Sequence, residues 1–140
     1  MTRLVIGVGH PYRGDDAAGL EVAQRVKTAV CRQSITGTFE LLDLWEPEDD
    51  VIVVDATRSE ADPGTIVRID AAAEPLPEGT FASTHAVGIS ETIELARALG
   101  RMPHRLEIYG IEASDVTMGA PLSGAVARAV DAVVEEIDRA

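Results

Sequence analysis

Apolar and polar positions along the chain follow two alternating patterns. Runs rich in apolar residues predict strands at residues 4–8, 38–44, 51–54, 65–69 and 106–111. Elsewhere apolar residues recur every three or four positions, which predicts amphipathic helices at about residues 16–32 and 86–99. The same spacing predicts a last helix that begins near residues 121–123 and buries Val126, Val130, Val133, Val134 and Ile137.

Strands that alternate with helices are typical of an α/β protein. Strand–helix–strand units make neighbouring strands parallel and cover both faces of the sheet, so we expect a three-layer sandwich with a mostly parallel sheet. The chain has 140 residues without a repeat or a linker, which predicts one domain over residues 1–140. In such sheets ligands bind at the carboxyl ends of the strands, so residues that follow a strand are the candidates for chemistry.

Charge and cysteine content narrow the range of partners and compartments. Asp and Glu number 24 against 12 Lys and Arg, a net charge of −12 without a basic run, so we expect no nucleic-acid partner and no membrane partner. The single cysteine, Cys31, excludes an internal disulfide and a cysteine-based zinc cluster, and within the predicted helix 16–32 it is typical of a small apolar filler. The N-terminal apolar run is too short for a signal peptide, and no stretch is long enough to span a bilayer. We therefore expect a cytoplasmic protein.

The stretch GVGHPYRGDDAAG, residues 7–19, follows the first predicted strand. A dinucleotide-binding loop needs a glycine three residues after Gly9, but Tyr12 stands there, and Asp15 and Asp16 would repel a pyrophosphate. The chain also lacks the Gly-Lys-Ser/Thr sequence of a Walker A loop. Glycines that let the backbone turn sharply, followed by two carboxylates, suit a cation rather than a phosphate.

Three candidate groups follow predicted strands or precede a helix. Asp15 and Asp16 lie in the loop after the first strand, Asp55 directly follows the strand 51–54, and His85 stands just ahead of the second helix. If the central strands are neighbours, Asp16, Asp55 and His85 converge on one cleft. Two carboxylate oxygens and one ring nitrogen suit a divalent transition metal and leave positions open for water or substrate.

Each of these side chains also fits a structural role. Asp16 is suited to cap the first helix, Asp55 to cap a turn after its strand, and His85 to cap or solvate its loop. Trp45, beyond the predicted strand 38–44, fits either a partner contact or a cover for the edge of the core. It is the joint placement of the two aspartates and the histidine that supports a metal site.

Five blocks of sequence, in order, resemble those of one protein family. Gly7 and Gly9, with Asp15 six residues after Gly9, then Asp16 and Gly19, look like the signature G-x-G-N-x4-D-(D/E)-x-x-G. The other blocks are residues 53–56 with 63–65, residues 83–88, residues 109–112 and residues 122–123. The family is that of the endopeptidases that mature nickel–iron hydrogenases by removing a C-terminal extension from the large subunit.

The resemblance implies a twisted five-stranded sheet and a concrete activity. By position, Asp16, Asp55 and His85 correspond to the metal-binding and catalytic trio of such an endopeptidase. Its partner is the hydrogenase large-subunit precursor, and its cofactor is nickel carried by that substrate, although the isolated protein can take up another divalent metal. A metal held there polarises the scissile carbonyl or lowers the pKa of a bound water. Asp15 is expected to orient the helix end rather than to act as a general base.

The sequence departs from the family pattern at two places. His10 replaces the asparagine of the first signature, and we expect it either to hold the loop or to add a metal ligand. After Asp43, ordinary connection lengths predict that about ten residues that flank the cleft in the family are missing here. The second departure supports an alternative hypothesis, a non-catalytic relative that binds a metal or a partner through the same cleft.

Overall fold

The computed structural model describes residues 2–35, 39–73 and 86–140, and it confirms the predicted α/β fold class. The strands are β1 (Arg3–Val8), β2 (Val30–Ser34), β3 (Asp50–Thr57), β4 (Ile66–Asp70) and β5 (Arg105–Glu112). The helices are α1 (Ala18–Arg25), α2 (Ala86–Ala98) and α3 (Gly124–Arg139), with short 3-10 helices η1 (Gly14–Ala17) and η2 (Phe39–Asp43). The five strands form one sheet in the order β2-β1-β3-β5-β4, in which only the edge strand β4 is antiparallel to its neighbour.

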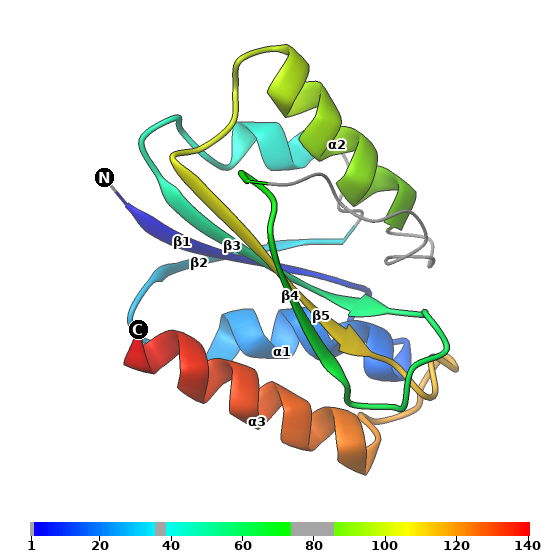
Figure 1. The fold of residues 1–140 in the computed structure, drawn as a ribbon. Coiled ribbons are helices and arrows are strands. Elements are labelled where there is room, and N and C mark those ends of the chain that lie inside the picture. The colour runs from blue at the N-terminus through cyan, green and yellow to red at the C-terminus, as the bar shows by residue number, and fades with distance from the viewer. Residues whose placement is uncertain (1, 36–38, 74–85) are drawn as a thin grey trace.

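The sheet separates two apolar cores. Helices α1 and α3 cover one face, and α2 with η2 covers the other (Figure 1). Side chains of a strand point alternately to the two faces, so in β3 Ile52 and Val54 pack toward α1 and α3, whereas Val51 and Val53 pack toward α2. Both sets are buried because β3 lies at the centre of the sheet. The carboxyl ends of β1, β3 and β5 therefore lie together at one end of the molecule.

Helix α3 buries one apolar stripe, as its sequence predicts. Val126, Val130, Val133 and Ile137 are buried, and Val134 packs at the margin of the same core. Its outer face carries the charged residues of the segment. In the parts of the chain that the structure describes, α3 and the other helices are all too short or too polar to cross a bilayer.

The predicted helix 16–32 is wrong in its second half. Helix α1 ends at Arg25, Val26 is already extended, and residues 30–34 form β2, so Cys31 lies in a strand. The cause is a tertiary contact, since the Asp138 carboxylate accepts hydrogen bonds from the backbone N–H groups of Lys27 and Thr28. These bonds hold the chain in a turn and lead it away from the helix axis.

The predicted strand 38–44 is also wrong, because residues 39–43 form η2. Leu41 and Leu42 are both buried in the core under α2, which a strand with alternating faces does not allow. The connection from β2 to β3 therefore runs over residues 35–49 and contains a helical turn. The inference that a cleft-flanking segment is missing after Asp43 was built on this predicted strand and loses that basis.

Trp45 covers the core and is not a partner contact. Its ring is 1% exposed, and its Nε1–H donates to the carbonyl oxygen of Arg101 at 3.0 Å. The Arg101 side chain in turn donates to the carbonyl oxygen of Leu42 at 3.0 Å. These bonds fasten η2 and the segment before β3 to the turn that leads into β5.

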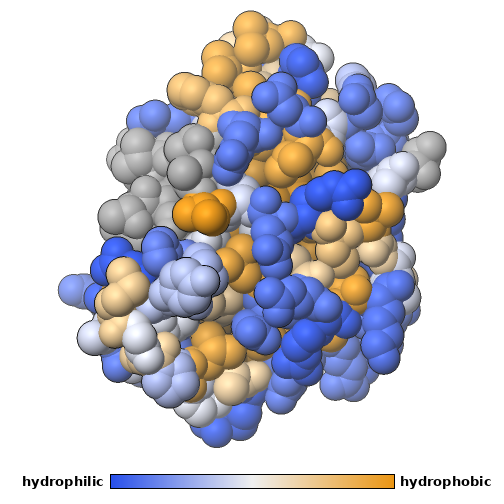
Figure 2. Space-filling view, turned by 180° about the vertical axis from the view of Figure 1, so that it is seen from behind, coloured by the Kyte–Doolittle hydropathy of each residue, from blue (hydrophilic) through white to orange (hydrophobic). Residues whose placement is uncertain are grey.

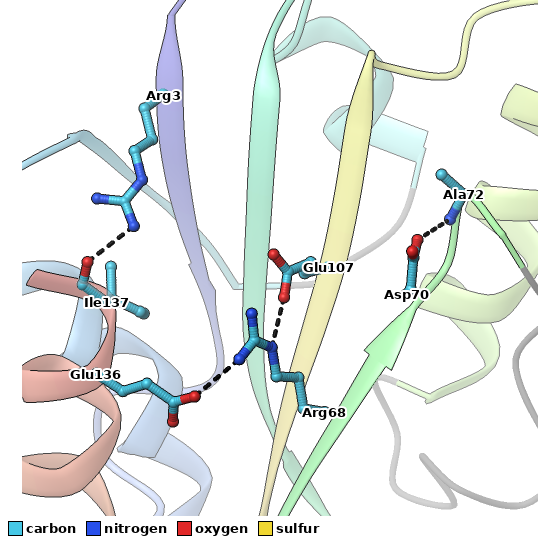
Figure 3. A network of polar contacts seen from close by, with 7 residues as sticks. All are labelled: Arg3, Arg68, Asp70, Ala72, Glu107, Glu136 and Ile137. Carbon is cyan, nitrogen blue, oxygen red and sulfur yellow. Dashed lines mark hydrogen bonds and ion pairs between the residues drawn. The ribbon is translucent and has the colours of Figure 1, made fainter. Parts of the chain in front are cut away.

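The antiparallel edge strand is tied to the rest of the molecule by Arg68. Its guanidinium donates to Glu107 of β5 at 2.5 Å and to Glu136 of α3 at 2.8 Å, and lies 5.4 Å from the ring centre of Tyr109 (Figure 3). Beside this network, at the amino end of β5, is an open cavity of about 780 Å³ whose lining includes Arg68, His104 and Arg105. The cavity lies at the end of the sheet opposite to the candidate residues of the first strand and of β3.

Close backbone approach seats the start of α1 on the central strands. A Cβ atom built on Gly19 would lie 2.1 Å from the carbonyl oxygen of Val54 and 2.6 Å from that of Val8. A Cβ atom on Gly9 would lie 2.1 Å from the carbonyl oxygen of Asp16. The glycines of the first signature are therefore needed because the loop and helix lie directly against β1 and β3.

We expect the substitution Gly19→Ala to lower the free energy of unfolding by about 2 kcal/mol or more, since the new methyl group meets rigid backbone oxygens. Urea unfolding followed by circular dichroism measures this loss. Gly124→Ala is the matched control: a Cβ atom there meets only the flexible Arg128 side chain, at 3.4 Å, so its stability should stay the same or rise slightly. Equal midpoints for the two variants would contradict the close-approach explanation.

Candidate functional site

The two candidate aspartates lie on adjoining elements at the carboxyl end of the sheet. Asp55 is part of β3, two residues before its end, and not beyond the strand as the sequence suggests. It is fully buried, pairs in register with Gly110 of β5, and accepts a 2.8 Å hydrogen bond from the backbone N–H of Ala56 on Oδ1. Asp16 lies in η1, which packs against β3, and is 6% exposed.

Asp16 closes the loop that precedes it. Its Oδ2 accepts a 3.2 Å hydrogen bond from the backbone N–H of His10. The residue before α1 is Ala17, and within the described residues no side chain caps this helix, so the N-cap interpretation of Asp16 is wrong. The carboxylate is instead directed back toward the start of the loop, beside the end of β1.

Asp15 has a structural role, as expected. Its fully buried carboxylate accepts hydrogen bonds from the backbone N–H groups of Ser114 (2.8 Å), Asp115 (3.0 Å) and Ser123 (2.7 Å), and from the Ser123 hydroxyl (2.9 Å). Ser123 directly precedes α3. These four hydrogen bonds occupy both carboxylate oxygens and fix the start of α3 to the first loop.

His10 holds the loop with its ring. Its Nδ1 accepts a 3.2 Å hydrogen bond from the backbone N–H of Tyr12, and the two rings meet edge to face with centres 6.0 Å apart. This is the kind of side-chain-to-backbone bond expected of the asparagine in the family signature. With Nδ1 engaged, only Nε2 is available for another contact.

His85, the third member of the predicted trio, lies outside the described residues. Helix α2 begins at the next residue, Ala86, as the sequence predicts. In residues 2–35, 39–73 and 86–140, no three His, Cys, Asp or Glu side chains are grouped closely enough to hold a metal ion. A metal site made of Asp16, Asp55 and His85 therefore stays a prediction.

Glu112 is a buried carboxylate whose role the sequence does not reveal. It is 3% exposed at the end of β5 and accepts hydrogen bonds from the Thr57 hydroxyl (2.8 Å) and from the Ser59 backbone N–H and hydroxyl. These bonds anchor the chain as it leaves β3, next to Asp55. The only signal in the sequence is a glutamate directly after the apolar run Ile108–Ile111, and it does not identify Ser59 as the partner.

Two other residues have no catalytic role in this geometry. Cys31 is half-buried, and desolvation together with the nearby Asp138 carboxylate raises the pKa of its thiol, which disfavours the nucleophilic thiolate. His104 is exposed in the turn before β5 and lines the cavity at the far end of the sheet.

We expect Asp15→Asn to lower the free energy of unfolding by about 3 kcal/mol, because an amide turns one hydrogen-bond acceptor into a donor that faces N–H groups. Chemical denaturation measures the loss. Asp115→Asn is the matched control, since Asp115 is exposed and its Oδ1 accepts from the backbone N–H of Thr117, a role an amide oxygen can keep. An Asp15 variant as stable as the Asp115 variant would contradict the anchoring role.

Solved structures share this fold over nearly the whole chain. The maturation endopeptidase HybD from Escherichia coli is 23% identical, with a TM-score of 0.81 over 98% of this chain and 90% of that one. The [NiFe] hydrogenase maturation protease HybD from Thermococcus kodakarensis is 24% identical, with a TM-score of 0.77 over 99% and 98%. At these identities the structures establish the fold alone.

Sequence comparison extends the likeness beyond the fold. A putative hydrogenase maturation protease from Methanocaldococcus jannaschii is 28% identical over 96% of this chain and 92% of its own length. The hydrogenase expression/formation protein HupD from Rhizobium leguminosarum bv. viciae is 27% identical over 94% of this chain and 70% of its own. The family model described as hydrogenase maturation protease (HycI) matches residues 36–140, which is most of the chain. The chain therefore belongs to the hydrogenase maturation protease family.

Proposed function

We propose that this protein is a metal-dependent endopeptidase that removes the C-terminal extension of a nickel-loaded hydrogenase large-subunit precursor. Asp16, Asp55 and His85 are the proposed metal-binding and catalytic residues, and the cytoplasm is the proposed location. The observation that carries the proposal is the burial of two carboxylates, Asp16 and Asp55, on adjoining elements at the carboxyl end of the sheet. Membership in the maturation protease family gives this pair its chemical context.

The donor set fits a divalent cation. Transfer of a carboxylate from water into a protein interior costs several kcal/mol, by rough estimate, unless hydrogen bonds or a cation offset it. The Asp16 carboxylate accepts a backbone hydrogen bond from His10 and the Asp55 carboxylate one from Ala56, so both are buried acceptors near the end of β3. Two carboxylate oxygens with an imidazole nitrogen from His85 form a mixed set that nickel accepts.

The division of labour between Asp15 and Asp16 supports this assignment. Asp15 bonds the loop after β1 to the start of α3. Asp16, the next residue, is thereby held beside the end of β3. Nickel bound there supplies Lewis-acid chemistry, which polarises the scissile carbonyl or lowers the pKa of a bound water. The protein residues hold the ion, orient the precursor and distinguish a nickel-loaded precursor from an empty one.

The alternative of a non-catalytic relative loses its main support. It rested on a cleft-flanking segment thought to be missing after Asp43, and the connection between β2 and β3 instead runs over residues 35–49 with η2 inside it. The processing experiment below distinguishes a non-catalytic relative from a protease.

Incubation of the protein with nickel-loaded large-subunit precursor should release a shortened large subunit, detected by gel mobility and mass spectrometry. We expect Asp16→Asn and Asp55→Asn each to slow this processing more than about 100-fold, because each removes a charged ligand of the proposed metal. The matched control is Asp49→Asn: Asp49 is a buried carboxylate at the amino end of β3, bonded to the N–H groups of Thr2 and Glu46, so its loss should reduce stability without reducing processing. A wild-type protein that leaves the precursor intact would favour the non-catalytic alternative.

Calorimetric titration with Ni²⁺ separates metal binding from cleavage. We expect the wild-type protein to bind the ion and Asp16→Ala to bind at least about tenfold more weakly, since one of two carboxylate ligands is gone. Equal binding by the two proteins would mean that the metal site is assigned to the wrong residues.

A further inference from the structure

Exposed apolar side chains gather near the candidate site. Among the described residues, seven large apolar side chains are exposed, and four of them lie on segments that follow the carboxyl ends of β1, β2 and β5. These four are Tyr12, Ile35, Phe39 and Met118. Tyr12 and Met118 are the most exposed of all seven, at 70% and 63%. Exposed apolar side chains carry meaning where neighbouring segments bring them onto one surface, which is typical of protein–protein interaction sites.

Tyr12 and Met118 stand on two loops that are bonded into one unit. The backbone N–H of Gly119 donates to the carbonyl oxygen of Tyr12 at 2.7 Å, and the Asp15 N–H donates to the carbonyl oxygen of Asp115 at 2.8 Å. The Asp15 carboxylate and the Arg13 guanidinium add further bonds between the same loops. The two exposed side chains therefore project from a rigid support.

The position of Tyr12 is fixed although its ring is in solvent. Its N–H is bonded to His10 Nδ1, its carbonyl oxygen to Gly119, and its ring lies edge-on to the His10 ring. An exposed aromatic side chain on a fixed backbone loses little conformational freedom on binding, which is the property of an interface anchor. Tyr12 lies four residues before Asp16, on the same loop.

The net charge of the chain limits which class of partner can bind over Tyr12 and Met118. The net charge of −12 repels nucleic acid, an anionic membrane and a second copy of the chain, and attracts a polypeptide that carries basic residues. On the face seen from behind, hydrophobic surface is interrupted by hydrophilic residues (Figure 2). Separate apolar anchors within a polar surface suit a protein segment better than a broad dimer interface.

We propose that Tyr12 and Met118 form a docking rim for an apolar segment of the protein substrate that also carries basic residues. The proposal rests on the proposed function and adds the surface that brings the precursor to the metal site. The rim adds affinity through buried apolar area, and the net negative charge of the chain speeds the encounter with a basic partner. Neither residue takes part in the cleavage chemistry.

The test is a kinetic comparison on the nickel-loaded precursor. The double variant Tyr12→Ser with Met118→Ser should raise KM about tenfold or more and leave kcat within about twofold, because only docking is weakened. Leu99→Ser is the matched control: Leu99 is 59% exposed just beyond the end of α2, and its variant should keep the wild-type KM. Circular dichroism and thermal unfolding of the variants should match the wild type, since all three side chains are exposed.

An unchanged KM in the double variant, with active wild-type protein, would overturn the docking rim and leave the proposed function intact. If the wild-type protein does not cleave, direct binding to the same precursor replaces the kinetic test. Binding by the wild type that weakens tenfold in the double variant would then support the rim without the protease, whereas equal binding or none would overturn it. A change of oligomeric state in the double variant would also overturn it in favour of a second copy.

Discussion

The structure depends on the direct seating of the first loop and helix on the two central strands. Gly19 lies against the carbonyl oxygens of Val8 and Val54, and Gly9 against that of Asp16, at distances that leave no room for a side chain. This close approach places Asp16 next to the end of β3, where Asp55 is buried. Any side chain at these glycines would lift the loop from the sheet and separate the two carboxylates.

The two adjacent aspartates have different tasks because their surroundings differ. Asp15 accepts four hydrogen bonds from the segment that enters α3, whereas Asp16 turns toward the end of β1 and receives a bond from His10. The first is a tie between loops, and the second is directed to the candidate site. A rigid loop that carries both can hold a metal ligand and, at Tyr12, an exposed anchor.

The sequence predicts the central elements well because burial shapes their pattern. Strands at residues 4–8, 51–54 and 106–111 and the helices α2 and α3 follow directly from apolar runs and helical spacing. The sequence does not predict the edge strand β2, because most of its side chains are exposed and give no apolar run. In addition, Val26, after the end of α1, continues the helical spacing of apolar residues. What ends α1 is the Asp138 carboxylate, more than a hundred residues away, and no local pattern contains that contact.

The site shows the same limit. The motif singles out Asp15, Asp16 and Asp55 as residues at strand ends, but the structural role of Asp15 depends on Ser114 and Ser123, which only the fold brings near. The structural role of Glu112 likewise cannot be predicted from the sequence, because it depends on hydrogen bonds from Thr57 and Ser59. His10, a departure from the family signature, turns out to hold the loop through Tyr12.

The central claim is that Asp16 and Asp55 hold a divalent ion between the first loop and β3, and paramagnetic broadening by Ni²⁺ tests it most directly. In a ¹⁵N-labelled sample, the amide signals of His10, Asp16 and Ala56 should broaden first as the ion is added. Broadening centred on His104 at the opposite end of the sheet, or no broadening near Asp16, would contradict the account.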